Sequence, residues 1–540
     1  MKRFKPGVSF GDFVVTDVKE TPGRIKKERE IDYRRGWAVW LVILAAMGGI
    51  LVRLGVLQIL SGGKYRILAD ENRIKKIRLV AERGKILDKN GQDLRAMRAA
   101  AAHVVGYVGE VNEEEVGLLR DAGQKYELGS QIGRTGIEEQ YEERLRGRDG
   151  GRLVEVNSQQ EVVRELGRQE AEAGSDLTLT LDAGLQQAAW EALRQRLGLT
   201  KGAVIASDPQ TGGILALVSS PAFDPRSVTA TSEFFNRAIG GVYPPGSVFK
   251  MVTAVAAMES GKANRDFTYT DTGSVSVGRF AYTNWYFTQY GRTEGVVGWE
   301  KALARSVDTF FYKVGELTGP ETLATWAEKF GMGTKTGIDL PGEVAGLIPT
   351  PDWKWKTKKE RWFLGNTYHM AIGQGDVLVT PLQINLMTNV IAAGGKKCVP
   401  HLNKIFNIQC SMINIGDEIL TVVKAGMIGA CSEGGTAYPF FDWNGSSVAH
   451  SAEASRAESL PTVACKTGTA EYVQANGKTG SHAWFTVFAP AEDPTISVTV
   501  LVEGGGEGSR AAAPIARKIL VKYFGVEDKF DYGLVKGIGE

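Results

Sequence analysis

The chain has 540 residues, of which 43% are apolar and 23% are charged, an ordinary globular composition that can build one large core and a smaller domain. This composition excludes a disordered, collagen-like or small disulfide-rich protein. Lysine and arginine total 64 against 62 acidic residues, a formal charge of +2, so we expect no nucleic-acid partner.

A long apolar run near the start predicts a membrane helix. Residues 37–60 contain one charged residue, Arg53, and are long enough at helical rise to span about 30 Å of bilayer hydrocarbon. A cleaved signal peptide has a shorter core that lies closer to Met1, so we expect a retained anchor. A buried helix of a soluble protein is the alternative.

The flanking charges do not orient this helix, because residues 23–36 and 61–80 each carry six Lys or Arg. Long domains are translocated largely regardless of charge. We therefore expect residues 1–36 to form a cytoplasmic tail and the body of the chain to lie outside the cytoplasm.

Residues 61–175 are charged, glycine-punctuated and only weakly periodic, which predicts a β-rich module without chemistry of its own. Asn90-Gly91 between two alternating runs predicts a hairpin over residues 84–94. Residues 133–156 predict a short helix, a glycine turn and a strand.

A second domain is predicted over residues 176–540, where an alternating strand runs directly into an amphipathic helix. Strand pairs are expected at 202–221 and 482–505, and helices at 247–260, 299–305, 380–393 and 509–524. Strands at both ends with helices between them predict an α+β domain whose terminal strands share one antiparallel sheet. The Gly-rich residues 503–509 lack the spacing of a phosphate-binding loop and predict a turn before the closing helix.

The cysteines predict neither a metal site nor a cofactor. Cys398, Cys410, Cys431 and Cys465 form no C-x-x-C pair, and the five histidines are scattered. We expect free buried thiols, with a bridge between Cys398 and Cys410 as the alternative.

Ser247 and Lys250 are the first pair of candidate catalytic residues. Their spacing puts both on one face of a helix that is otherwise apolar all round and therefore buried. A desolvated lysine has a lowered pKa and can accept the proton of a nearby hydroxyl. The simpler interpretation is an N-terminal serine with a snorkelling lysine. Ser61 and Lys64 have the same spacing in a polar linker where we expect no helix.

Two further candidates follow along the chain. Ser306 and Asp308 lie between two helical patterns, where they could point into a cleft or where Asp308 could cap a helix. Lys-Thr-Gly occurs at 335–337, 466–468 and 478–480, but only residues 466–468 lie in a strand-like run. There a glycine would let a ligand backbone approach the strand edge.

S-x-x-K, S-x-D and K-T-G in this order resemble the signature of penicillin-binding proteins and serine β-lactamases. "LALVSSPAFDP", "NRAIGGVYPPGSVFK", "AIGQG" and "HAWFTVFAPAEDP" resemble class B penicillin-binding proteins, most closely the elongation type, penicillin-binding protein 2. Residues 83–94, 102–111 and 133–147 are similar to the non-catalytic pedestal of that family. The resemblance extends from the membrane helix to about Phe524.

The resemblance implies a serine β-lactamase/transpeptidase-like fold on a shortened pedestal, and a peptidoglycan D,D-transpeptidase that needs no metal. It implies these roles: Ser247 as nucleophile, Lys250 as base, Ser306 as proton donor to the leaving amine, Asp308 as orienting group, Lys466 as a source of positive potential, Thr467, Gly468 and Thr469 as the substrate-binding strand, and the amides of Ser247 and Thr469 as the oxyanion hole.

By the same resemblance, the partners are peptidoglycan stem peptides, β-lactam antibiotics, a SEDS-family glycan polymerase and elongation scaffold proteins at the bacterial plasma membrane.

The sequence departs from the family pattern at two places. Asp308 replaces an asparagine found in many relatives, which favours the elongation type. A head insertion usual in the pedestal is missing near residues 93–109. Two alternatives remain. The first is a β-lactam-hydrolysing enzyme or a D,D-carboxypeptidase. The second is a non-catalytic scaffold or a β-lactam sensor, although the predicted cytoplasmic tail offers a sensor no effector domain.

Overall fold

The computed structural model describes residues 9–10, 13–14, 33–124, 126–157, 159–195, 201–227, 231–445, 460–473 and 477–535. The chain forms two compact units. One comprises residues 1–78 and 151–169, and the other comprises residues 79–150 and 170–540. Most of the predicted tail lies outside the described residues.

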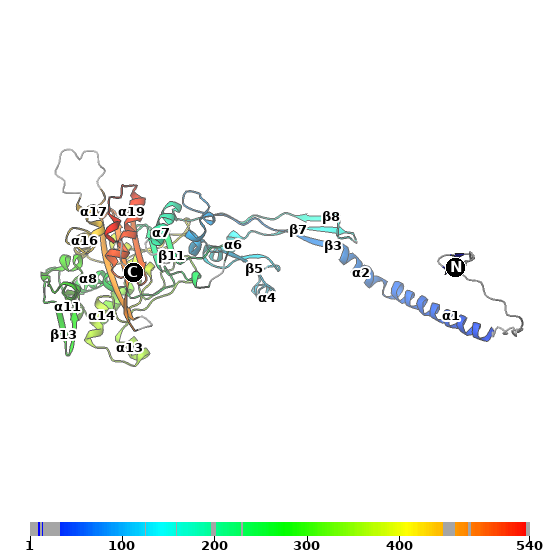
Figure 1. Cartoon of the computed structure of the whole chain (residues 1–540), viewed down its shortest axis with the longest axis horizontal. Coiled ribbons are helices and arrows are strands. Elements are labelled where there is room, and N and C mark those ends of the chain that lie inside the picture. The colour runs from blue at the N-terminus through cyan, green and yellow to red at the C-terminus, as the bar shows by residue number, and fades with distance from the viewer. Residues whose placement is uncertain are drawn as a thin grey trace, which may run out of the picture. The chain divides into compact units, whose positions relative to one another are not determined.

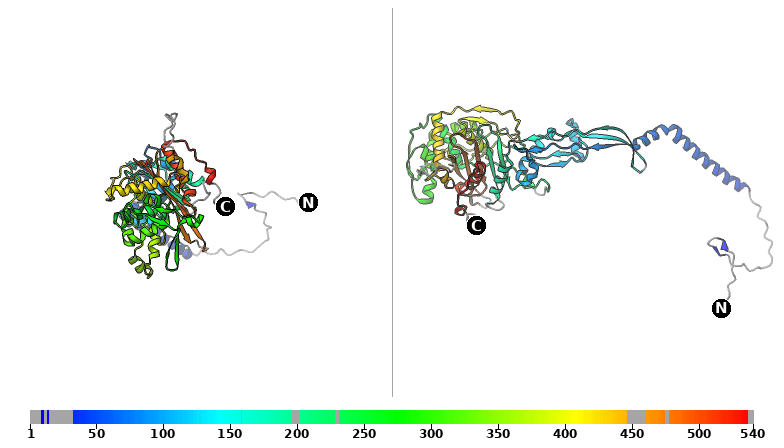
Figure 2. Two further views of the ribbon diagram at one scale, coloured as in Figure 1. Left: turned by 90° about the vertical axis from the view of Figure 1, so that its left-hand side faces the viewer. Right: turned by 90° about the horizontal axis from the view of Figure 1, so that it is seen from above.

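The first unit contains the predicted membrane helix. Helix α1 (Tyr33–Gly55) continues into a π-helical turn, η1 (Val56–Leu60), and appears as one long blue helix in Figure 2. The most apolar 18-residue window within residues 36–60 has a mean hydropathy of 2.2, and none of it is buried in protein. This exposure suggests a membrane anchor, because lipid can cover apolar surface that the protein leaves uncovered.

The rest of this unit is a helix and a small sheet. Helix α2 (Gly62–Arg73) leads to a sheet in the order β3 (Ile74–Leu79), β7 (Gly150–Val156) and β8 (Val162–Gln169). The prediction that no helix surrounds Ser61 and Lys64 is wrong, since α2 begins there. Lys64 is nevertheless exposed, so this pair lacks the buried amine of a nucleophile.

The second unit begins with short elements of the predicted pedestal. The helices are η2 (Leu94–Ala101), α3 (Ala102–Val105), α4 (Glu113–Asp121), α5 (Gly136–Gln140) and α6 (Glu142–Leu145), and the strands are β4 (Ile86–Leu87), β5 (Val108–Glu110), β6 (Gln131–Gly133) and β9 (Leu177–Thr178). The hairpin predicted at 84–94 is reduced to a tight turn, in which the Asp88 amide donates to the Gln92 carbonyl. Strand β4 pairs in parallel with β9 instead, because Ile86 joins a buried cluster with Leu177.

The predicted antiparallel sheet is present, with the order β11 (Ile214–Ser220), β10 (Gly202–Ser207), β20 (Ile496–Val502), β19 (Thr479–Ala489) and β18 (Ala464–Val473). All neighbours in it are antiparallel. Strands from both ends of the domain therefore lie side by side, and β18 forms one edge. The Gly-rich segment after β20 is the expected turn before α18 (Gly508–Ala511).

Helices cover both faces of this sheet, which explains why its central strands are apolar on both sides. Helices α7 (Ala183–Gln195) and α19 (Ala513–Phe524) pack on one face with Phe485 and Val500. Helices α8 (Lys250–Glu259) and α15 (Pro381–Ala392) pack on the other with Trp484 and Leu501. Figure 1 shows α8 and α7 on opposite sides of the sheet.

The other predicted helices are also present. Helix α10 (Trp299–Ala304) matches the prediction at 299–305, and α15 matches 380–393. The predicted helix at 247–260 begins as a 3₁₀ turn, η4 (Gly246–Phe249), and continues as α8. Helices α11 (Asp308–Thr318), α12 (Pro320–Lys329), α14 (Leu364–Ala371) and α16 (Asp417–Ala430) complete the body around α8.

A buried polar layer fastens α15 to the sheet. The amide of Asn389 donates to Ser207 Oγ at 2.9 Å, and Ser207 Oγ donates to Asn385 Oδ1 at 2.6 Å. Thr388 Oγ1 lies 2.7 Å from Thr486 Oγ1. These groups are buried, so removing one partner leaves another without its hydrogen bond.

We therefore expect Asn389→Ala to lower the free energy of unfolding by about 1–3 kcal/mol, the cost of a buried unpaired polar group. The measurement is the thermal midpoint of the purified chain. An unchanged midpoint would show that the polar layer adds no stability.

Candidate active site

The turn that carries Ser247 holds it at the start of the buried helix α8. In a 3₁₀ turn, residues three apart eclipse, so Ser247 and Lys250 share a face as the spacing predicts. The turn begins at Gly246, whose φ of 57° suits glycine and whose amide donates to the Gly373 carbonyl at 2.8 Å. Ser247 is half-buried and Lys250 is fully buried.

The amino group of Lys250 contacts the second predicted motif directly. Lys250 Nζ lies 2.8 Å from the Ser306 carbonyl, 3.1 Å from Ser306 Oγ and 2.6 Å from Asp308 Oδ1. Burial lowers the pKa of Lys250, and the negative charge of Asp308 opposes this by raising it. The pKa of Lys250 is thus lowered overall while its amine keeps a direct contact with Asp308, which the snorkelling interpretation does not explain.

Ser306 and Asp308 reach Lys250 from the start of α11. Ser306 has a φ of 55°, in the left-handed region that non-glycine residues rarely adopt, and this turns its carbonyl and hydroxyl toward the same amine. The prediction that Asp308 caps a helix is wrong. Asp308 is the first residue of α11, and its second oxygen, Oδ2, accepts the amide hydrogen of Trp285 at 3.0 Å.

The third motif lies on the edge strand β18. Lys466 is fully buried and its Nζ donates to the Thr467 carbonyl at 3.0 Å. Burial and the positive charge of Lys250 hold the pKa of Lys466 well below its usual value, with Asp308 opposing. Thr467 is buried and its Oγ1 lies 2.8 Å from Thr436 Oγ1, while Thr469 is exposed.

Close packing brings β18 against the turn that carries Ser247. A Cβ on Gly468 would lie 2.9 Å from Trp484 Cβ and 3.2 Å from the Pro245 carbonyl oxygen. A Cβ on Gly246 would lie 2.7 Å from the Thr469 carbonyl oxygen. The backbones of the first and third motifs can approach this closely only because both residues are glycines.

The structure thus brings all three predicted motifs together and leaves the other Lys-Thr-Gly runs outside. Residues 335–337 lie in a segment without regular structure, as predicted. At 478–480, Thr479 and Gly480 begin β19 at the end of the hairpin away from Lys466, and are therefore not a simple loop.

Several residues at the site had no motif that marked them. The Gln374 amide donates to the Thr469 carbonyl at 3.4 Å, and Thr436 pairs with Thr467. Trp285 and Asn284 contact Asp308 from another segment. The "AIGQG" run was the one available signal, since it contains Gly373 and Gln374.

The cysteines differ from the prediction, because all four are paired in the structure. Cys398 and Cys410 face each other across the antiparallel strands β16 (Lys396–Cys398) and β17 (Cys410–Met412). Cys431, at the end of α16, bonds to Cys465. Free thiols were expected because sequence spacing does not reveal that these pairs meet in space.

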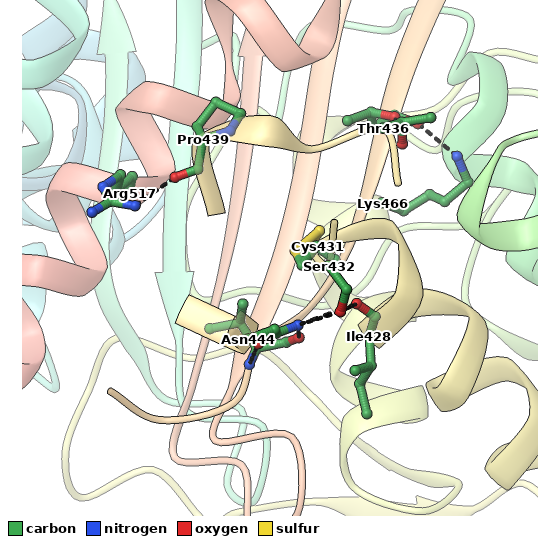
Figure 3. Close-up of a disulfide and its surroundings, with 11 residues drawn as sticks. Ile428, Cys431, Ser432, Thr436, Pro439, Asn444, Lys466 and Arg517 are labelled. Atoms are coloured by element: carbon green, nitrogen blue, oxygen red, sulfur yellow. Dashed lines mark hydrogen bonds between the residues drawn. A yellow bond between two sulfur atoms is a disulfide. The ribbon is translucent and has the colours of Figure 1, made fainter. Parts of the chain in front are cut away.

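The disulfide Cys431–Cys465 anchors β18 immediately before Lys466 (Figure 3). Asn444 supports the same place, since its amide donates to the Val463 carbonyl at 3.0 Å and its oxygen accepts the Val463 amide hydrogen at 2.9 Å. The strand that carries the third motif is therefore tied to the end of α16 by a covalent bond, and the residue before it, Val463, is tied to Asn444 by hydrogen bonds.

Comparison with known proteins identifies the family. Residues 202–521 match the model of the penicillin-binding protein transpeptidase domain, and residues 95–179 match that of the penicillin-binding protein dimerisation domain. The first match covers more than half of the chain, so the chain belongs to the penicillin-binding protein transpeptidase family. The resemblance and the fold class predicted from the sequence are confirmed.

Among relatives, the peptidoglycan D,D-transpeptidase MrdA of Acinetobacter baumannii is 34% identical over 453 residues, which are 76% of this chain and 63% of that protein. This chain therefore spans less than two thirds of that relative. The structure of a complex between PBP2 and MreC from Helicobacter pylori is similar with a TM-score of 0.69 at 26% identity, covering 84% of this chain and 99% of the other.

A further solved structure, described as structural coordination of polymerization and crosslinking by a peptidoglycan synthase complex, is similar with a TM-score of 0.71 at 28% identity. It covers 92% of this chain and 99% of the other.

Removing the disulfide next to Lys466 should destabilise the domain. Cys431→Ala combined with Cys465→Ala removes a disulfide between residues that are 34 apart in the sequence. The loss of this constraint on the unfolded chain should lower the free energy of unfolding by about 4 kcal/mol. We expect a lower thermal midpoint and slower acylation by penicillin, with Cys398→Ala/Cys410→Ala as the matched control for acylation. Acylation and a midpoint equal to wild type in the first variant would contradict this prediction.

The charge of Asp308 should set the pH dependence of the site. Asp308→Asn removes the charge that raises the pKa of Lys250, so this pKa falls and the acid limb of the acylation profile moves to lower pH. The rate at the optimum should fall roughly 10-fold, because a neutral hydrogen bond replaces a charge-assisted one. The measurement is the acylation rate between pH 5 and 10, and a limb that moves to higher pH would exclude Lys250 as the base.

Proposed function

We propose that this protein is a peptidoglycan D,D-transpeptidase that cross-links stem peptides during cell-wall elongation through an acyl-enzyme on Ser247. The observation that carries the proposal is the fully buried Lys250, which lies one turn behind Ser247 and contacts both Ser306 and Asp308. A buried amine with a lowered pKa, in a family of transpeptidase domains, is suited to activating a serine.

The reaction proceeds in two transfers. Lys250 accepts the proton of Ser247 Oγ, and the oxygen attacks the carbonyl between the last two D-alanines. The amides of Ser247 and Thr469 stabilise the oxyanion. Ser306 delivers a proton to the leaving amine and is reprotonated by Lys250, which contacts its Oγ, so that free D-alanine departs and the acyl group stays on Ser247. The amine of a neighbouring stem peptide then attacks this ester and loses a proton through Ser306 to Lys250. Lys250 returns that proton to Ser247 Oγ as the ester bond breaks, which restores the hydroxyl.

The edge strand β18 would bind the substrate. An extended peptide can add to the edge of a sheet, and β18 is an edge strand. Gly468 lets this strand lie close to the turn that carries Ser247. Thr467 and Thr469 bind the terminal carboxylate, and Lys466 contributes positive potential behind them. Asp308 orients Lys250. β-Lactam antibiotics would acylate the same serine.

The proposed domains follow the sequence boundaries: a tail over 1–36, a transmembrane helix over 37–60, a pedestal over 61–175 and a transpeptidase domain over 176–540. The N-terminus is cytoplasmic and the catalytic domain lies outside the plasma membrane of a bacterium. The similar structures of a PBP2–MreC complex and of a peptidoglycan synthase complex support an elongation scaffold protein and a SEDS-family glycan polymerase as partners.

The first test is labelling of the full-length protein in detergent with a fluorescent penicillin, followed by peptide mass mapping. We expect one stable adduct on Ser247, and a loss of at least 1,000-fold in labelling rate for Ser247→Ala, because the nucleophile itself is absent. Ser61→Ala is the matched control, since it removes the serine of the other S-x-x-K run. A folded protein without any adduct would favour the scaffold or sensor.

The second test separates transfer from hydrolysis. A transpeptidase holds its β-lactam adduct, whereas a hydrolase passes the acyl group rapidly to water. We therefore expect a single turnover of a chromogenic cephalosporin per protein molecule within minutes. Rapid multiple turnover would exclude the transpeptidase and favour the β-lactam-hydrolysing alternative, and release of D-alanine without cross-linking would favour a D,D-carboxypeptidase.

A further inference from the structure

A cluster of buried polar side chains contacts Asp308 through Asn284. It comprises Asp271 at the end of β12 (Tyr269–Asp271), Asn284 just before α9 (Trp285–Tyr290), and Thr309 in α11. Asp271 is 2% exposed, and the other two side chains are fully buried. None of the three belongs to a catalytic motif.

The carboxylate of Asp271 is fully hydrogen-bonded. Oδ1 accepts from Thr309 Oγ1 at 2.7 Å and the Gly273 amide at 2.9 Å, and Oδ2 accepts from Asn284 Nδ2 at 3.0 Å and the Glu294 amide at 2.8 Å. Burial acts to raise the pKa of Asp271, but these hydrogen bonds lower it overall. Asp271 is therefore a fixed anion that holds Asn284 and Thr309 in one orientation.

Asn284, which lies in another segment of the chain, in turn caps the N-terminus of α11. The residue before α11, Val307, offers no side-chain cap, so the first amide of α11 needs another acceptor. Asn284 Oδ1 supplies it, accepting the Asp308 amide hydrogen at 3.1 Å. The next residue, Trp285, donates its amide hydrogen to Asp308 Oδ2. Two consecutive residues thus hold both the backbone and the carboxylate of Asp308.

We propose that Asp271 and Asn284 are positioning residues of the transpeptidase reaction, which hold Asp308 in contact with Lys250. The inference rests on the proposed function and extends it to residues that do not touch the substrate. The charged groups facing Lys250 are Asp308 from α11 and Lys466 from β18. A displaced Asp308 would leave Lys250 beside Lys466 without its counter-charge.

The test uses the full-length protein in detergent and measures the second-order rate constant of acylation by a fluorescent penicillin across pH. For Asn284→Ala we expect a decrease of roughly 10–100-fold, typical of a slightly misplaced catalytic group. The acid limb of the profile should move to lower pH, because Lys250 has lost part of the charge that raises its pKa. A purely structural role would lower the thermal midpoint and leave the shape of the profile unchanged.

A charge swap tests the pair directly. Asn284→Asp places a second carboxylate against Asp271, and Asp271→Asn places an amide against the amide of Asn284. Combined, the two substitutions restore a donor facing an acceptor between positions 271 and 284, while the Glu294 amide loses its acceptor on residue 271. We therefore expect the double variant to be acylated faster than Asn284→Asp alone, with an interaction visible in the double-mutant cycle.

Two further variants separate the possible outcomes. Thr309→Val keeps the shape of the side chain and removes one hydrogen bond to Asp271. If Asn284→Ala does not fold, this variant tests whether the cluster positions Asp308. Asn389→Ala is the matched control, a buried asparagine of the α15 layer whose loss should lower the thermal midpoint and leave the acylation profile unchanged.

If the wild type is acylated and the folded variants at 284 and 309 keep its rate and pH profile, the positioning role is overturned and the proposed function stands. If the folded wild type forms no adduct on Ser247, the proposed function and the positioning role both fail.

Discussion

The burial of one amino group, that of Lys250, shapes the organisation of the catalytic domain. An amine taken out of water needs compensating contacts, and a buried ion pair is stable only when its remaining polar groups are also bonded. Ser306 and Asp308 supply these contacts from a helix distant in sequence. The left-handed backbone of Ser306 and the position of Asp308 at the very start of α11 are consequences of that need.

The same constraint spreads outward from the amine. Asp308 can hold Lys250 only while its own amide and second oxygen are bonded, which brings Asn284 and Trp285 into the site. Lys466 adds a second buried amine, so the site keeps two lysines and one aspartate out of water. Burial lowers the pKa of both lysines, and the negative charge of Asp308 opposes this shift.

The sheet fixes the position of β18 relative to Ser247 and Lys250. Strand β18 lies at the edge of the sheet and pairs with one strand of it, β19. Glycines at 246 and 468 allow the turn that carries Ser247 to pack against β18, and the disulfide at Cys465 keeps this strand attached to α16. Ser247 and β18 are thereby held together by packing and covalent chemistry from three separate segments.

The sequence by itself determined the local features of this protein: the apolar helix near its start, the main strands and helices, and the pairing of Ser247 with Lys250, because periodicity and residue spacing act over a few residues. It also distinguished Lys466 from two similar runs by strand context. The partner of β4, the pairing of the four cysteines, the contact of Asp308 with Lys250 and its support by Asp271 and Asn284 were decided only by the tertiary structure. These contacts join residues that lie far apart along the chain, and no local propensity specifies which distant segments meet.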